Sequence, residues 1–177
     1  TKLKCENIIK KKLIPSKFNV VILRYFNVSG SNYLSNLGQF NNNNQLMINL
    51  CNFYLDKKKY FNIYGKNYET KDGTCVRDFI HVLDLADIHW HIVRKFKIKK
   101  INLIVNCGYG KGYTVLEIVK KFQKLTNYSF NIKYLNRRKG DIPKSVTSVK
   151  LLKKKLKWKP KYNSLNKIIL SDLKWQK

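Results

Sequence analysis

Acidic residues are scarce in this sequence, which has 10 Asp and Glu against 37 Lys and Arg and a formal net charge of +27 at pH 7. A positive field of this size attracts polyanions, so binding to nucleic acids or anionic surfaces is one candidate function. However, no nucleic-acid recognition motif is present. Lysine occurs in short runs (Lys10–Lys12, Lys57–Lys59, Lys153–Lys155), and Asn41–Asn44 form a small polar tract. A compositional drift toward Lys and Asn explains the charge better, and we expect no specific nucleic-acid partner.

Arginine is also scarce, because only five of the 37 basic residues are Arg. Where Lys is the default cation, an Arg answers a geometric need, since its planar guanidinium donates to carboxylate or phosphate oxygens in pairs. Arg24, Arg77, Arg137 and Arg138 are therefore candidates for fixed geometric roles.

The cysteines form no pairs in sequence, since Cys5, Cys51, Cys75 and Cys107 are far apart and contain no CxxC spacing. Reduced thiols in a cytosol-like compartment fit best, so we expect a cytoplasmic location. No apolar run approaches the about 20 residues that a membrane span needs, so we expect a soluble protein without a membrane partner. The sequence begins at Thr1 and leaves an upstream targeting segment open.

The order of periodic segments predicts an α/β fold of one-domain size. Strands are expected at 20–26, 61–64, 75–82, 101–106 and 132–135, and helices at 1–12, 46–55, 84–96, from 114, 151–156 and 165–175. The run 20–26 is apolar enough to be buried on both faces of a parallel sheet. Residues 28–44 are expected to form a polar loop, and the strands at 61–64 and 75–82 a short hairpin.

Glycines follow the strand at 101–106, in Gly108-Tyr109-Gly110-Lys111-Gly112. Tyr113 occupies the third glycine position of a GxGxxG dinucleotide motif, and no acidic residue stands at the distance that reads a ribose. A tight turn into a helix is the better interpretation, because Thr114 and Glu117 have capping-box spacing.

The most informative stretch runs from Tyr68 to Asp87, YETKDGTCVRDFIHVLDLAD. Lys71-Asp72-Gly73 predict a turn before a strand, and Asp84 is expected to cap a helix with an apolar face. Arg77 lies in the strand, where its guanidinium could bind phosphate or form an ion pair with Asp78 or Asp84. These two interpretations are about equally good from the spacing alone.

Histidine and aspartate also cluster at the end of this stretch and just after it, at His81, Asp84, Asp87, His89 and His91. As metal ligands they would have to converge from a strand and from different sides of a helix, and no HExxH-type spacing is present. We therefore expect no metal site.

The stretch closely resembles the DGTxVRDYIHVxDLA segment of the UDP-glucose 4-epimerase family, in the extended short-chain dehydrogenase/reductase superfamily. The resemblance spans essentially the whole sequence and corresponds to roughly the C-terminal half of such an enzyme. It implies the C-terminal part of an NAD(P)-binding Rossmann-like doubly wound domain plus a small α/β substrate-binding lobe. Residues 1–30 would belong to the Rossmann-like domain, and 31–177 mainly to the nucleotide-sugar-binding lobe with interleaved Rossmann strands.

The resemblance implies NAD-dependent interconversion of UDP-galactose and UDP-glucose through a 4-keto intermediate. Lys2 matches the lysine of the family's YxxxK motif, which lowers the pKa of the catalytic Tyr and holds the nicotinamide ribose. That Tyr would lie three residues before Thr1, so this stretch alone is expected to be inactive. The backbone near Tyr25, in LRYFN, is expected to meet the nicotinamide.

The same resemblance implies a UDP-hexose substrate. Asn27 would face the sugar nucleotide, and Gln45 and Leu46 fall in a substrate loop where the family usually has Asn-Leu. Asn62 and Tyr64 stand where the family brackets the uracil, with the aromatic ring stacking on the base.

Two arginines would bind the diphosphate of that substrate. Arg77 takes the family's pyrophosphate-gripping position, and Arg138 and Asp141, in RRKGD, match a phosphate-binding Arg and a ribose-binding Asp. A homodimer is expected for the full-length protein. The departures from the family include Val28 in place of Pro and Asn32 in place of His. The alternatives are a pentose 4-epimerase or 4,6-dehydratase of the same superfamily, and a basic nucleic-acid-binding module without catalysis.

Ser145 occupies a position where a larger residue can close the sugar pocket. We predict that its small side chain leaves room for an N-acetyl group, so that UDP-GlcNAc and UDP-GalNAc are also substrates of the full-length protein. Epimerisation of UDP-galactose without any epimerisation of the N-acetylated pair, measured on the same preparation, would contradict this prediction.

Overall fold

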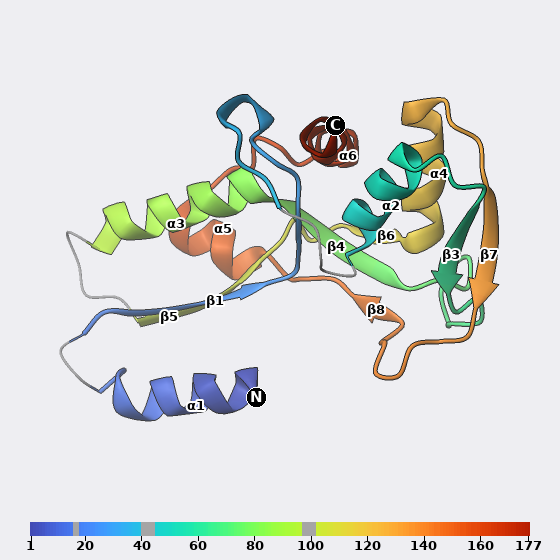
Figure 1. Ribbon diagram of the computed structural model, residues 1–177. Helices are drawn as coiled ribbons and strands as arrows, with labels where there is room; N and C mark the ends of the chain where they lie inside the picture. The colour runs from blue at the N-terminus through green and yellow to red at the C-terminus, as the bar shows by residue number, and fades with distance from the viewer. Residues whose placement is uncertain (16–17, 40–44, 97–101) are drawn as a thin grey trace.

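The computed structural model describes residues 1–177 except 16–17, 40–44 and 97–101 (Figure 1). The Asn41–Asn44 tract, Ile101 and the side chain of Phe96 lie outside the described residues. The helices are α1 (Lys2–Lys12), α2 (Leu46–Leu55), α3 (Val82–Phe96), α4 (Val115–Thr126), α5 (Lys150–Leu156) and α6 (Leu165–Gln176), with a 3-10 turn η1 (Tyr33–Ser35). The strands are β1 (Val20–Tyr25), β2 (Asn27–Ser29), β3 (Tyr60–Tyr64), β4 (Val76–His81), β5 (Asn102–Cys107), β6 (Gly112–Thr114), β7 (Asn131–Leu135) and β8 (Lys144–Ser145).

The strands form three small sheets, and most of their pairs are parallel. β1 pairs with β5, and β3 pairs with β7, both in parallel. β4 pairs in parallel with β2 and β8 and antiparallel with β6. The predicted α/β class is therefore confirmed. The predicted hairpin of β3 and β4 is wrong, because the two strands belong to different sheets and their partners come from distant parts of the chain.

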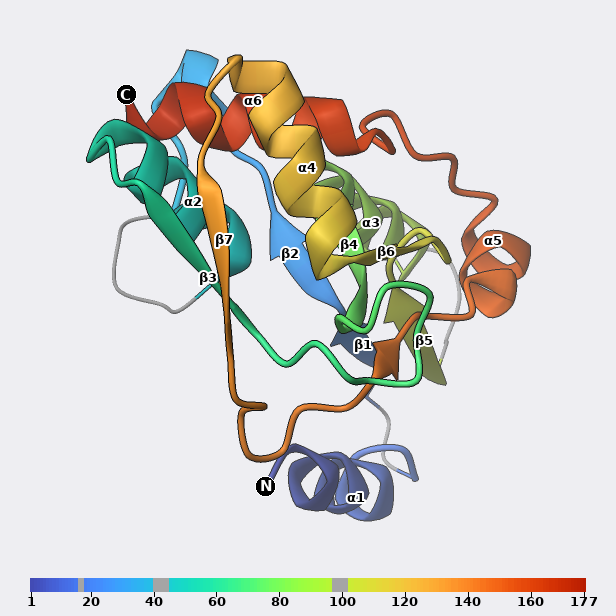
Figure 2. The same cartoon turned by 90° about the vertical axis from the view of Figure 1, so that its right-hand side faces the viewer.

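Two apolar cores hold these sheets to the helices. Figures 1 and 2 show α2 and α4 beside β3 and β7. The first packs α2, α4 and α6 around β3, with Leu50, Ile63 and Phe122 fully buried. Phe61 and Ile63 of β3 bury their side chains in this core, and Ile132 of β7, which lies opposite Phe61 in the strand register, packs against it. The second core lies between α3, α5 and the β4 and β5 strands.

β1 confirms the strand predicted at 20–26, but the prediction of burial on both faces is wrong. Only Val20 is buried, Val21 to Leu23 are half-buried, and Arg24 and Tyr25 are exposed. The reason is that the sheet formed by the described residues has only two strands, β1 and β5. The polar loop predicted at 28–44 is also partly wrong, because it contains the last two residues of β2 and the η1 turn.

Two helix N-termini had a capping residue predicted from the sequence, and one of the two predictions is correct. The predicted capping box of α4 is confirmed, with the Glu117 N–H donating to Thr114 Oγ1 at 3.0 Å and the Thr114 N–H donating to Glu117 Oε2 at 2.9 Å. The predicted capping role of Asp84 is wrong, because α3 begins two residues earlier, at Val82. The apolar face predicted for α3 is confirmed by the burial of Leu85 and Ile88.

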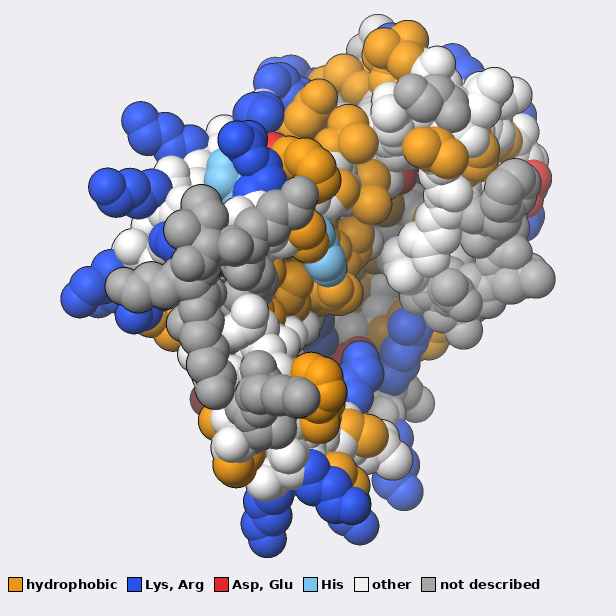
Figure 3. All heavy atoms as spheres, turned by 90° about the vertical axis from the view of Figure 1, so that its left-hand side faces the viewer, with side chains coloured by type: hydrophobic (Ala, Val, Ile, Leu, Met, Phe, Trp, Pro, Cys, Tyr) orange, Lys and Arg blue, Asp and Glu red, His pale blue; other side chains and the backbone are white. Residues whose placement is uncertain are grey.

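Lysine side chains lie on the solvent side, as predicted for the runs at 57–59 and 153–155, which are exposed. Lys and Arg side chains project around the rim of the face in Figure 3, while apolar side chains run up its middle. No helix in the described ranges has the length and hydropathy that a membrane span requires.

Candidate functional site

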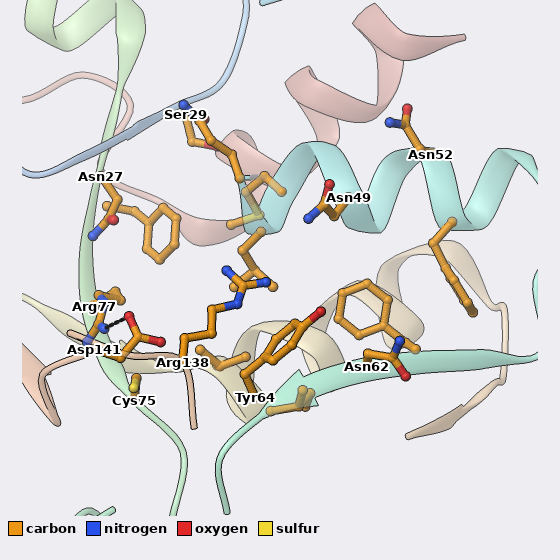
Figure 4. Close-up of a pocket in the computed structure, with 18 of the residues that line it drawn as sticks. Asn27, Ser29, Asn49, Asn52, Asn62, Tyr64, Cys75, Arg77, Arg138 and Asp141 are labelled. Carbon is orange, nitrogen blue, oxygen red and sulfur yellow. Dashed lines mark hydrogen bonds and ion pairs between the residues drawn. The ribbon is translucent and has the colours of Figure 1, made fainter. Parts of the chain in front are cut away.

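A single cavity of about 840 Å³ brings most of the predicted site residues together. Ten of the eleven line it: Lys2, Tyr25, Asn27, Gln45, Leu46, Asn62, Tyr64, Arg77, Arg138 and Asp141. Figure 4 shows six of these residues around the cavity: Asn27, Asn62, Tyr64, Arg77, Arg138 and Asp141. Tyr25 and Tyr64 both stand at the carboxyl ends of parallel strands, the edge at which α/β sheets bind ligands.

Arg77 is held in place by backbone oxygens. Its Nη1 donates to the carbonyls of Ile142 at 2.8 Å and Val76 at 3.0 Å, and its Nη2 lies 3.4 Å from Asp141 Oδ1. The side chain is only 17% exposed. The guanidinium is therefore oriented by the 141–142 segment, which folds back beside β4.

The alternative that paired Arg77 with Asp78 or Asp84 is wrong. The buried Asp78 carboxylate accepts N–H groups from Tyr109 at 3.1 Å, Gly110 at 2.9 Å and Thr147 at 3.2 Å. Burial raises the pKa of the Asp78 carboxyl, although these donors oppose the shift. The buried Asp84 carboxylate accepts from the backbone of residues 161 and 162 and from a tyrosine hydroxyl.

Arg138 contacts an aromatic ring of the cavity. Its guanidinium carbon lies 3.8 Å from the centre of the Tyr64 ring (Figure 4). The residue predicted to bind phosphate therefore contacts the residue predicted to stack on the base. Asn27 is oriented by a hydrogen bond in which its Nδ2 donates to the Asp78 carbonyl at 2.9 Å. The hydrogen bond orients Asn27, while Arg138 rests on the Tyr64 ring through a ring contact.

Lys2 reaches the cavity because α1 is anchored to β1. Arg24 donates to both oxygens of Glu6, with Nε at 2.9 Å and Nη2 at 2.6 Å, and Lys10 lies 2.6 Å from the same carboxylate. These cations lower the pKa of Glu6 to about 2, with the hydrogen bond from Arg24 as the largest cause. The apolar residues predicted for this helix contribute less, because Leu3 and Ile8 are exposed.

Ser145 is the exception among the predicted residues. It lies on β8 opposite Arg77 in the strand pairing and is not among the described residues that line the cavity. Its proposed effect on the sugar pocket stays a prediction.

Asn49, Asn52 and Asp56 were not predicted from the sequence, and with Gln45 they form a polar stripe on α2 and its flanks. Gln45, Asn49, Asn52 and Asp56 all line the cavity, and their spacing of four, three and four residues places them on one face of the helix. This spacing was visible in the sequence. The buried residues of α2, including Leu50, pack on the core instead.

Two of the histidines considered as metal ligands, His81 and His89, each contact a hydroxyl group. His81 Nε2 lies 3.1 Å from Ser171 Oγ, and His89 Nε2 lies 2.7 Å from the Tyr25 hydroxyl. Across the residues that the structure describes, no three His, Cys, Asp or Glu side chains are grouped closely enough to hold a metal ion.

Comparison with known proteins identifies the family of this chain. Residues 1–108 match the model of the NAD dependent epimerase/dehydratase family. The chain belongs to this family. It is 34% identical over 178 residues to the UDP-glucose 4-epimerase of Azospirillum brasilense, covering 100% of this chain and 51% of that protein. It is 35% identical over 177 residues to UDP-arabinose 4-epimerase 1 of Arabidopsis thaliana, covering 97% of this chain and 42% of that protein.

A solved relative has the same fold. The UDP-glucose 4-epimerase of Bifidobacterium longum, crystallised with NAD+ and UDP, superposes with a TM-score of 0.89 at 32% identity. The superposition covers 99% of this chain and 52% of that one. This epimerase-family chain therefore spans about half the length of the relatives it matches.

The Glu6 contacts generate a test of the α1 anchor. The pKa of Glu6 falls from 4.5 to about 2 on folding, so its ionised form stabilises the folded state, fully above pH 4.5 and progressively less as the pH falls toward 2. We expect Glu6→Gln to lower the free energy of unfolding near neutral pH, and the difference from the wild type to shrink below pH 4.5. Urea unfolding at a series of pH values measures both.

Asp56→Asn is the matched control, because Asp56 is an exposed carboxylate whose contact with Lys58 is also exposed. It should change the free energy of unfolding little at any pH. A stability loss from Glu6→Gln that is constant between pH 7 and pH 2 would contradict the anchor.

Proposed function

We propose that this chain forms the UDP-sugar-binding part of an NAD-dependent UDP-glucose 4-epimerase, an isomerase of carbohydrate (galactose) metabolism. The complete enzyme would interconvert UDP-galactose and UDP-glucose through a 4-keto sugar. The observation that carries the proposal is that one cavity collects ten residues predicted to bind the cofactor and substrate. The UDP-glucose 4-epimerase relatives support the reaction, and the bound NAD+ and UDP of one solved relative support the ligands.

The substrate would lie along the cavity from its sugar to its base. Arg77 and Arg138 would bind the diphosphate, since guanidinium groups match phosphate oxygens in pairs. Tyr64 and Asn62 would hold the uracil, and Asp141 a ribose hydroxyl. Asn27, Gln45 and Leu46 would face the hexose. With the diphosphate anchored at one end, the 4-keto sugar can turn and present its other face.

The cofactor end of the cavity would be formed by Lys2 and Tyr25. The donor set fits NAD, because an ammonium beside a strand end can bind a ribose hydroxyl and stabilise a nearby tyrosinate. Bound NAD would supply the redox chemistry by accepting and returning the C4 hydride. Lys2 would hold the ribose and lower the pKa of the catalytic tyrosine.

The domain assignment belongs to the same proposal. Residues 1–30 would form part of the dinucleotide-binding domain, together with β5, which pairs with β1 along its full length. Residues 31–177 would otherwise form the nucleotide-sugar-binding lobe. A homodimer of the complete protein and a cytoplasmic location complete the proposal. The free thiols of all four cysteines agree with a reducing compartment.

A UDP-pentose 4-epimerase is the second candidate, supported by the similarity to the plant UDP-arabinose 4-epimerase. Assays with UDP-arabinose and UDP-galactose on the complete protein would separate the two. The 4,6-dehydratase and the basic nucleic-acid-binding module have no comparable support.

Binding of UDP to the 177-residue chain tests the substrate assignment. We expect measurable binding by calorimetry, and Arg77→Lys should weaken it by about tenfold, since Lys cannot donate in pairs. Arg94→Lys is the control, because Arg94 is exposed on α3 and is not among the described lining residues. Equal affinity of the wild type and the Arg77 variant would remove Arg77 from the site.

Turnover provides a second test. The 177 residues include Lys2 but not the tyrosine that the YxxxK motif places four positions before it. We therefore expect the chain alone, supplied with NAD and UDP-galactose, to form no UDP-glucose. Calorimetric binding of UDP by the same preparation would show that the protein is folded. Product formation above the no-protein control would contradict the assignment of the catalytic tyrosine.

A further inference from the structure

Arg138 differs from Arg77 and Arg137 in the type of contact that its guanidinium makes. Within the described part of the chain, the Arg138 guanidinium has no hydrogen-bond acceptor or acidic partner, and its contact is the Tyr64 ring at 3.8 Å. Arg77 is instead held by the Ile142 carbonyl and Asp141. Arg137 donates to the side chain and carbonyl of Asn67. Arg138 is therefore the arginine of this cluster that can leave its position without breaking a hydrogen bond to the protein.

Strand pairing places Arg138 beside Tyr64. β3 and β7 run parallel, with Tyr64 opposite Leu135, and the Gly65 N–H donates to the Leu135 carbonyl at 2.8 Å. Arg138 follows three residues after this fixed point, in an exposed loop. The ring is therefore fixed at a strand end, while the arginine that covers it lies on a segment outside the sheet.

The guanidinium and a nucleobase would use the same surface of the ring. Both stack on an aromatic face, the guanidinium by a cation–π contact and the base by stacking. Tyr64 and Arg138 both line the cavity, and Figure 4 shows the guanidinium over the ring on the cavity side. A base that stacks on this side of Tyr64 must displace Arg138.

We propose that Arg138 is a specificity-determining residue that makes the Tyr64 ring accessible to nucleoside diphosphates and less accessible to uncharged nucleosides. The inference rests on the proposed function, in which Tyr64 binds the base. A diphosphate compensates the loss of the ring contact, because its oxygens form charge-assisted hydrogen bonds with the displaced guanidinium. A nucleoside without phosphate displaces Arg138 and offers no such bonds. The residue thus couples recognition of the base to recognition of the phosphates.

Binding of uridine, UDP and inorganic pyrophosphate to Arg138→Gln tests this coupling by calorimetry. Uridine should bind the variant about two- to fivefold more tightly than it binds the wild type, because the cation–π contact no longer competes. UDP and pyrophosphate should bind about tenfold more weakly, because the charged donor is lost. Opposite signs for uridine and UDP are the decisive result.

Arg137→Gln is the matched control. Arg137 also lies over an aromatic ring, that of Tyr68 at 4.2 Å, but it is not among the described lining residues. It should leave the ratio of UDP to uridine affinity unchanged. In a second control, Tyr64→Leu should remove the gain in uridine affinity that Arg138→Gln produces alone.

Each outcome has a defined meaning. Weaker binding of both uridine and UDP to Arg138→Gln would overturn the inference, since it would mean that the base does not compete with the guanidinium. Unchanged uridine affinity would overturn it as well. If wild-type protein binds none of the three ligands while its thermal unfolding is cooperative, the proposed function itself fails, and the inference with it.

Discussion

The buried carboxylate of Asp78 is the interaction on which the site depends most. It lies on β4 and accepts backbone N–H groups from Tyr109, Gly110 and Thr147. These bonds attach the turn after β5 and the segment after β8 to the same strand. Burying a carboxylate costs free energy unless hydrogen-bond donors satisfy it. Asp78 therefore needs all three N–H donors, and this requirement holds the turn after β5 and the segment after β8 against β4.

The close approach around Asp78 also explains a glycine. A Cβ on Gly108 would lie 2.4 Å from Thr147 Cγ2 and 2.8 Å from Asp78 Oδ2. Gly108, the first glycine of the run that looks like a dinucleotide motif, is therefore required by the packing of this turn against Asp78 and Thr147. Arg77 precedes Asp78 on β4 and lines the cavity. The Ile142 carbonyl and the Asp141 carboxylate orient its guanidinium.

The cavity lies against the first core, whose residues Met47, Phe53, Phe61, Ile63 and Phe79 line it. The first core supports α2 and β3, which carry the polar stripe and the Tyr64 ring. The second core supports β4 and β5. Phe79 of β4 belongs to the first core and also lines the cavity, so a ligand there contacts residues far apart in the sequence, from Lys2 to Asp141. The relatives of this epimerase-family chain extend over about twice its length.

The sequence by itself determined the α/β class, the positions of most helices and strands, and which arginines make specific contacts. Each of the four arginines singled out by the scarcity of Arg makes a specific contact: Arg24 with Glu6, Arg77 with Ile142, Arg137 with Asn67 and Arg138 with Tyr64. The contacts of α4 were predictable because a capping box is local, with both partners within three residues.

Only the tertiary structure decided what these groups contact. Asp84 looks like a helix cap in sequence but binds the backbone at 161 and 162, and β3 pairs with β7 rather than with its neighbour β4. Burial and strand pairing act across long sequence separations, and no local pattern records them. The two arginines of RRKGD are neighbours in sequence, but folding places Arg138 over the Tyr64 ring in the cavity and Arg137 over the Tyr68 ring, and no local pattern distinguishes the two.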